Sequence, residues 1–285
     1  MRFVTFQRVG RAPEPGVVAG GEVIGLGPAG FCDLLGVIAG GDEARTRVET
    51  WAAEAPASAR FDLGSVKLLA PIPRPPKIVC VGLNYADHAR EANLEMPKVP
   101  TIFAKFPTAV IGPEAHIVLP KASARPDYEA EFAFVVGRGG RHIPGGRWRE
   151  HVFGYTNFND VSARDYQMAT TQWMMGKTFD TFAPMGPWIV SADEIADPHA
   201  LDIKLTLNGE VMQSSNTRHL IFGIPELLEF LSGVFTLEPG DVVSTGTPAG
   251  VGFARKPPRY LRPGDEVVVE VQGLGQLHNP VVAEA

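Results

Sequence analysis

Three acidic residues recur at every second position of the segment RPDYEAEFAFVVG, and their types and spacing suit the binding of a metal ion. Asp127, Glu129 and Glu131 lie at the start of an apolar run that is typical of a buried β-strand, and alternate side chains of a strand point to the same face. The two glutamates would then lie about 6.5–7 Å apart, close enough for both to reach one cation whose oxygen ligands sit at ~2.0–2.6 Å. Unpaired carboxylates in an apolar environment are costly, so the pattern indicates a cation site. The alternative is a half-exposed strand whose acids face solvent.

A third candidate ligand, Asp160, lies in GYTNFNDVSARDYQ, in a turn-rich segment just before a helical one. Ligation by carboxylate oxygens alone favours Mg²⁺, Mn²⁺ or Ca²⁺, whereas zinc calls for histidine or cysteine. We therefore expect Glu129, Glu131 and Asp160 to hold one divalent ion.

Two further groups have the residue types needed for acid–base chemistry and for anion binding. His88 and Glu91 are three residues apart in GLNYADHAREAN, so on a helix the carboxylate can orient the imidazole as a general base. Arg164 and Gln167 have the same spacing, and Lys177 follows. An arginine fork suits a carboxylate, and a lysine ammonium suits a developing oxyanion. Taken alone, each group is more often a solvated surface feature.

The elements that must position these residues are mostly short strands. Gly 31 and Pro 25 among 285 residues favour turns over long helices. From residue 77 onward the patterns predict strands at 77–85, 100–106, 116–120, 130–137, 201–210, 241–247 and 265–273. Helices are predicted at 84–93, 162–172 and 223–237.

A proline-rich segment, APIPRPPK, separates two regions of different character. The residues before it predict short strands at 2–9 and 16–27 and a helix at 42–55. The segment itself should be extended, because proline prevents helix and ladder pairing. We expect a small N-terminal β-rich domain over residues 1–70 and a main domain over residues 71–285.

One glycine motif invites a nucleotide-binding interpretation that its context does not support. Gly25, Gly27 and Gly30 satisfy G-x-G-x-x-G after a short strand. The fingerprint requires a longer βαβ unit with an acidic residue ~20 positions on, and the following residues predict only a short helix. We therefore do not expect a nucleotide site.

The amino-acid composition argues against some classes of binding partner. The chain is 45% apolar and 20% charged, with a net charge of −6 and no block of lysine or arginine, which argues against nucleic acid and against an anionic membrane. Only two cysteines are present, as suits a reducing compartment, and no run reaches the ~18 apolar residues of a membrane helix. We expect a cytoplasmic protein whose partner is a small substrate or another protein.

Several segments taken together resemble, in order, the signature blocks of the fumarylacetoacetate hydrolase superfamily. They are VGLNYADHAREAN, PTIFAKFPTAVIGP, DYEAEFAFVVG, GYTNFNDVSARDYQ, GKTFDTFAPMGPWIV and LEPGDVVSTGTPAGVGFARKPP. The blocks QSSNT and GFARKPP are most similar to the branch that contains fumarylacetoacetate hydrolase domain-containing protein 2. The resemblance runs from about residue 77 to the C-terminus. It implies a mixed, β-rich α+β fold, a β-sandwich roll beside a small N-terminal domain, in a homodimer with one Mg²⁺ or Mn²⁺ per subunit.

The resemblance also assigns roles residue by residue. It matches Glu129, Glu131 and Asp160 to the metal ligands. It implies catalytic roles for His88, Glu91, Lys177 and Gln167, and substrate contacts for Arg164, Thr247, Lys105 and Gly246.

The implied activity is metal-dependent hydrolysis of a C–C bond in an acylpyruvate or other β-diketo acid, through a metal-stabilised pyruvate enolate. The alternatives within the family are an oxaloacetate decarboxylase and a 2-oxo acid keto–enol tautomerase, isomerase or hydratase of aromatic catabolism. A metal-stabilised binding protein without turnover is the alternative outside enzymes.

Overall fold

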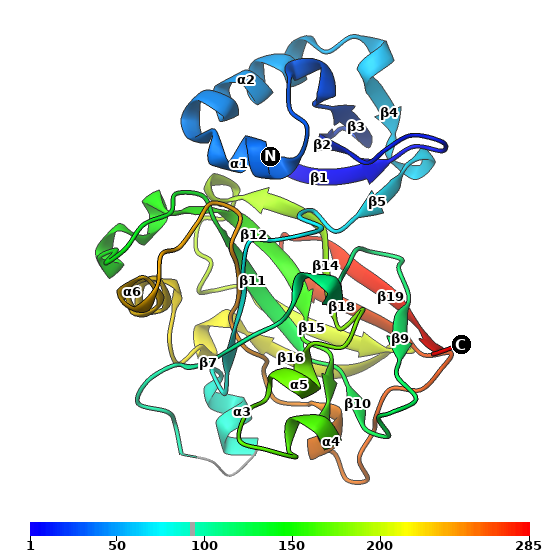
Figure 1. Cartoon of the computed structure of the whole chain (residues 1–285), viewed down its shortest axis with the longest axis vertical. Helices are drawn as coiled ribbons and strands as arrows, with labels where there is room; N and C mark the ends of the chain where they lie inside the picture. Colours follow the sequence, from blue (N-terminus) through cyan, green and yellow to red (C-terminus); the bar gives the residue numbers. More distant parts are fainter. Residues whose placement is uncertain (92–94) are drawn as a thin grey trace.

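The computed structural model describes residues 1–91 and 95–285 of the chain. One long sheet joins the N-terminal residues to the rest of the molecule (Figure 1). Its strand order is β4 (Arg60–Asp62), β3 (Glu22–Gly25), β2 (Glu14–Ala19), β1 (Arg2–Gln7), β14 (Ala183–Ser191), β12 (Val152–Asn159), β11 (Ala130–Val136), β17 (Val242–Ser244), β6 (Ile78–Gly82) and β7 (Thr101–Ala104), with β5 (Lys67–Leu69) on β1 and β8 (Val110–Ile111) on β14. Because β1 pairs with β14, the N-terminal unit shares this sheet, and the domain boundary at residue 70 stays a prediction.

A second sheet faces the first and closes a sandwich. It contains β16 (Glu210–Asn216), β15 (Asp202–Leu207), β18 (Glu266–Val271), β19 (Gln276–Ala283) and β9 (Ile117–Leu119). Buried residues alternate along β15 and β18, as expected for a sheet with one face on the core. Every residue of β11 is buried, since one of its faces meets the second sheet and the other faces a separate core cluster. The expected β-rich α+β sandwich is confirmed.

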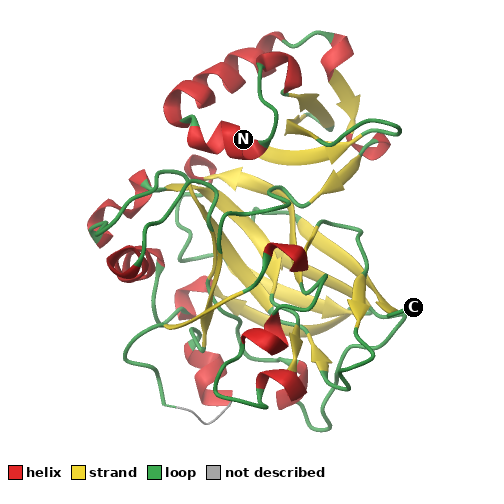
Figure 2. Cartoon of the chain, in the orientation of Figure 1, coloured by secondary structure: helices red, strands yellow, loops and turns green. Residues whose placement is uncertain are grey.

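The helices lie outside the sheets (Figure 2). They are α1 (Leu34–Ala39), α2 (Gly41–Glu54), α3 (Ala86–Glu91), α4 (Arg164–Gln167), α5 (Met174–Lys177) and α6 (Ile224–Val234). In Figure 1, α3, α4 and α5 gather at the end of the sandwich that is opposite to the N-terminal strands. These three short helices carry the residues that the sequence singled out for acid–base chemistry and anion binding.

Four predicted elements differ from the structure. The strand expected over 16–27 is divided into β2 and β3, which pair with each other. The helix expected over 162–172 is confined to α4, and α5 follows it. The helix expected over 84–93 begins at Ala86, and residues 92 and 93 lie outside the described residues. The strand expected through 125–137 is divided into β10 (Pro126–Asp127), which pairs with β13 (Ser162–Ala163), and β11. Glu129 therefore lies between two strands.

Candidate metal and catalytic site

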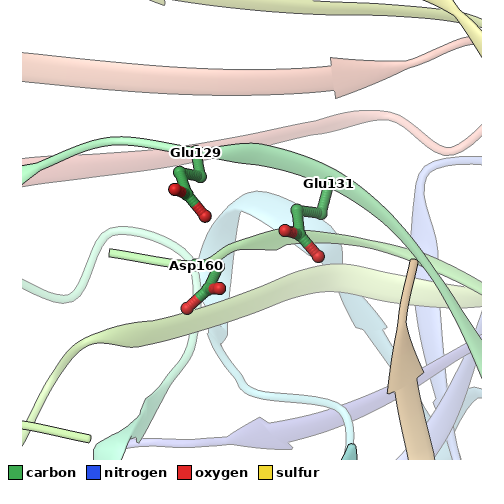
Figure 3. Close-up of side chains that lie close together, drawn as sticks. All are labelled: Glu129, Glu131 and Asp160. Carbon is green, nitrogen blue, oxygen red and sulfur yellow. The ribbon is translucent and has the colours of Figure 1, made fainter. Parts of the chain in front are cut away.

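Two neighbouring strands bring the three predicted metal ligands together. β11 and β12 are antiparallel, with Ala130 opposite Asn159, so the start of one strand lies beside the end of the other. The backbone N–H of Asp160 donates to the carbonyl of Glu129 at 3.0 Å. Carboxylate oxygens of Glu129, Glu131 and Asp160 lie within 4.8 Å of one another and point to a common centre (Figure 3). Oxygens bound to one ion at ~2.0–2.6 Å are at most about 5 Å apart, so the separation fits a single ion.

Two of the three carboxylates already have cationic partners. Lys177 Nζ lies 2.7 Å from Glu129 Oε2 and 2.7 Å from Asp160 Oδ2. Arg164 Nη1 lies 2.6 Å from Glu129 Oε1, and Lys105 pairs with Asp160. Burial would raise the pKa of Glu129, but Lys177 and Arg164 outweigh burial and lower it to about 2. Glu129 is therefore stable as an anion without a metal ion.

Glu131 is different, because no cationic side chain of the described residues lies within ion-pair distance of it. Its Oε2 accepts hydrogen bonds from Ser244 Oγ at 2.5 Å and from the N–H of Gly246 at 2.9 Å. Burial raises the pKa of Glu131, and the charges of Asp160 and Glu129 raise it further. A buried carboxylate without a cation, next to two others, has the charge and the donor atoms that a hard divalent cation requires. The residues present thus fit Mg²⁺ or Mn²⁺.

The acid–base pair lies on α3. His88 Nδ1 is 3.3 Å from Glu91 Oε2, which leaves Nε2 as the ring nitrogen free for proton transfer. Glu91 also accepts from the N–H of Gly250 at 3.0 and 3.1 Å. Burial would raise the pKa of Glu91, but the hydrogen bonds from His88 and Gly250 lower it. Glu91 therefore stays ionised beside the imidazole.

A cavity of about 240 Å³ connects these two groups. Its walls include the three carboxylates, His88, Lys177, Arg164, Gln167 and Thr247, with the aromatic side chains of Phe103, Trp173 and Phe253. A candidate cation site, a candidate general base and cationic donors thus line one small cavity. Enolisation of an anionic carbonyl compound requires these three kinds of group.

Three predicted residues contact the carboxylates of the site instead of being free to bind a substrate. Lys105 and Gly246 do not line it: Lys105 pairs with Asp160, and Gly246 holds Glu131. Lys177 contacts carboxylates rather than standing free for an oxyanion. Their substrate-binding and catalytic roles stay predictions.

The site also contains aromatic and amide side chains that were not predicted from the sequence. The aromatic walls come from separate segments and carry no local signal. Gln213 is buried, and its Nε2 donates to Thr247 Oγ1 at 2.8 Å while its Oε1 accepts from the N–H of Ala130 at 2.8 Å. Gln213 is the first residue of the QSSNT block, so that motif was the available signal. Asp127, expected on the same face of a strand as the ligands, is fully buried and paired with Arg164 at 2.9 Å.

Comparison with known proteins identifies the relatives of this chain. The family model "Fumarylacetoacetate (FAA) hydrolase C-terminal" matches residues 77–282. The chain is 52% identical over 219 residues to oxaloacetate tautomerase FAHD2A, mitochondrial, of Bos taurus, covering 76% of this chain and 70% of that protein. The Homo sapiens protein of the same name is 50% identical over 219 residues, with the same coverage.

Solved structures agree with this relationship. Fumarylacetoacetate hydrolase from the psychrophilic Exiguobacterium antarcticum is 38% identical, with a TM-score of 0.89 and 100% coverage of both chains. Maleylpyruvate hydrolase from Sphingobium sp. SYK-6, in complex with manganese(II) and pyruvate, is 31% identical, with a TM-score of 0.83 and 100% coverage of both chains. No helix among the described residues is long and apolar enough to cross a membrane. The chain belongs to the fumarylacetoacetate hydrolase family of enzymes, in the branch of fumarylacetoacetate hydrolase domain-containing protein 2.

Proposed function

We propose that this enzyme is a divalent-metal-dependent tautomerase that interconverts the enol and keto forms of oxaloacetate or of a closely related 2-oxo acid. The observation that carries the proposal is the placement of His88 and three buried carboxylates on one small cavity. The relatives named oxaloacetate tautomerases support it. They favour this alternative over the C–C bond hydrolysis that the sequence resemblance first suggested.

Glu129, Glu131 and Asp160 would hold Mg²⁺ or Mn²⁺, and the manganese in the maleylpyruvate hydrolase structure supports a divalent ion. Such an ion supplies Lewis-acid stabilisation of negative charge that develops on the 2-oxo group. Lys177 uses two of its three N–H donors on Glu129 and Asp160, which leaves one for an oxygen of the substrate.

Tautomerisation moves one proton between C3 and the oxygen on C2, and His88 has the position for it. Its Nε2 would take the proton from C3 and then give it to the oxygen on C2, which forms the enol and regenerates the imidazole. Between the two transfers the ionised Glu91 would stabilise the imidazolium through Nδ1. In the reverse direction Nε2 would take the O–H proton of the enol and the imidazolium would give it to C3. The mostly apolar enclosure by Phe103, Trp173 and Phe253 strengthens these electrostatic interactions by excluding water.

Hydrolysis is the second candidate, because a solved relative is named a maleylpyruvate hydrolase. In that reaction the same histidine would deprotonate a water molecule rather than a carbon atom. The homodimer stays a prediction. So does the cytoplasmic location, which the mitochondrial names of the relatives do not favour.

Product analysis distinguishes the candidates. The enol form of oxaloacetate is mixed with enzyme and Mg²⁺ or Mn²⁺ while enol absorbance, CO2 and pyruvate are followed in parallel, beside a panel of acylpyruvates. Fast loss of enol without CO2 or pyruvate supports the tautomerase. Stoichiometric CO2 and pyruvate from oxaloacetate would show a decarboxylase instead, and cleavage of an acylpyruvate without enol–keto acceleration would show a hydrolase. For a tautomerase, the His88→Gln variant should lose the enol–keto acceleration.

A further inference from the structure

Asp127 is a buried carboxylate that the proposed chemistry does not use. It is 0% exposed, and four donors surround it. Oδ1 accepts from the backbone N–H groups of Tyr128 at 2.9 Å and Gly252 at 2.8 Å. Oδ2 accepts from the N–H of Phe253 at 3.0 Å and from Arg164 Nε at 2.9 Å. Such complete satisfaction of a buried anion fixes the groups that donate to it.

These bonds join two walls of the cavity that come from distant parts of the chain. Arg164 lies on α4, and its guanidinium stacks on the ring of Phe253 with Cζ 4.5 Å from the ring centroid; both residues line the cavity. The approach is close, since a Cβ added to Gly252 would lie 2.4 Å from Asp127 Oδ1. The same segment holds Glu91 through the N–H of Gly250.

The guanidinium has one donor group left after these contacts. Nε is bonded to Asp127, and Nη1 contacts Glu129 Oε1 at 2.6 Å and Gln167 Oε1 at 2.9 Å. Nη2 is buried and has no hydrogen-bond partner among the residues that the structure describes. An unpaired buried donor is costly, and in a cavity wall it can bind a carboxylate.

We propose that Asp127 is a positioning residue: it holds the guanidinium of Arg164 against Phe253 so that Nη2 stays directed at a substrate carboxylate. The inference rests on the proposed function in that the ligand is a 2-oxo acid anion. Without the Asp127 carboxylate, the Nε–H of Arg164 and three backbone N–H groups lose their acceptor. The guanidinium plane and the segment 250–253 are then free to shift together. The effect should therefore fall on ligand binding and should require Arg164.

A double-mutant cycle tests this relation. Asp127→Asn, Arg164→Gln and the double variant are compared for KM with oxaloacetate and, in the presence of Mn²⁺, for the Kd of pyruvate by calorimetry. Asp127→Asn should raise both constants about tenfold or more while changing kcat less, because buried charge pairs are costly to break. In the Arg164→Gln background the same change should alter them less than twofold. Additive effects, or an unchanged Kd in Asp127→Asn, would overturn the proposal.

Asp241→Asn is the matched control. Asp241 is also 0% exposed and accepts from a backbone N–H and from Lys77. It lies just before β17, at the opposite end of that strand from Ser244, the residue that contacts Glu131. This variant should leave KM and Kd unchanged. If Asp127→Asn does not fold, Phe253→Leu takes its place in the cycle, and it too should be non-additive with Arg164→Gln. If the wild-type enzyme binds pyruvate but does not convert oxaloacetate, the proposed function is refuted alone, and the Kd values of the double-mutant cycle still test the role of Asp127. If the wild-type enzyme binds no pyruvate, both proposals are overturned.

Discussion

Replacing Glu131 by glutamine should stabilise the metal-free enzyme and remove its response to metal. The carboxylate has no cationic partner in the described structure, and burial with the charges of Asp160 and Glu129 raises its pKa. Glutamine keeps the acceptor for Ser244 and Gly246 and removes the charge. The unfolded chain ionises with an ordinary pKa near ~4.3, so keeping the folded carboxyl neutral at pH 7 costs at most about 4 kcal/mol, at ~1.4 kcal/mol for each pH unit above that value.

That figure is an upper bound on the stability that the substitution adds. The wild-type carboxyl can always take up a proton when ionisation would cost more free energy than protonation. We expect Glu131→Gln to raise the free energy of unfolding in chelator at pH 7 by about 1 to 4 kcal/mol. The pKa is raised in the folded state, so the wild-type penalty grows as the pH rises above ~4.3, and the gain should vanish near pH 4.

The matched control is Glu129→Gln, which should have the opposite sign. Glu129 is paired with Lys177 and Arg164, and its pKa is lowered to about 2. Removing its charge leaves two buried cations short of a partner, which costs about 3–5 kcal/mol.

Urea unfolding, with chelator and then with Mn²⁺, measures these effects. Wild type should gain about 2.7 kcal/mol when Mn²⁺ is at 100 times its Kd, and both variants should lose most of that gain. The reasoning is refuted if Glu131→Gln is less stable than wild type in chelator, or if it keeps the full stabilisation by Mn²⁺.

Three further predictions concern single side chains. His88→Gln should lower kcat for enol–keto conversion by about 10²- to 10⁴-fold with little change in Tm, measured by stopped-flow absorbance; an unchanged kcat would exclude His88 as the base. Burial lowers the pKa of His278, but hydrogen bonds to Glu114 and Glu266 outweigh it and raise that pKa, so its ion pairs stabilise the fold below pH ~6.5 and are lost as the pH rises through the raised pKa. The unfolding free energy of His278→Gln should accordingly vary less than that of wild type between pH 6 and 8, and equal slopes would contradict this. Leu231 on α6 is 1% exposed, so Leu231→Ala should lower the free energy of unfolding by about 2–5 kcal/mol, measured in urea. A loss under 1 kcal/mol would show that α6 is not packed as described.

Local spacing accounts for the parts of the site that could be predicted from the sequence. Glu129 and Glu131 are two residues apart, and His88 and Glu91 are three apart, so their proximity depends only on local conformation. The hydrogen bonds that hold the buried carboxylates in place are not local: Ser244 and Glu131 are 113 residues apart, and Gly252 and Asp127 are 125 apart. The local sequence around these residues does not indicate which distant residue each of them contacts.

The same distinction holds for the fold. The alternation along β15 and β18 was readable because one face of each strand is buried. The pairing of β1 with β14 depends on which edge is free after the chain has folded back, and strands of two residues such as β8 and β10 are too short to show a period. The split between β10 and β11 has a related cause, because Asp127 turns toward Arg164 and Gly252 rather than toward the metal ligands.

The most direct test of the proposed function is the rate of enol–keto conversion of oxaloacetate as the metal is removed and restored. Wild-type enzyme treated with chelator should lose the acceleration and regain it on addition of Mn²⁺ or Mg²⁺, whereas Glu131→Gln should stay folded and inactive under both conditions. Full acceleration by chelator-treated wild type, or by Glu131→Gln, would contradict the assignment of Glu129, Glu131 and Asp160 as the metal site of a tautomerase.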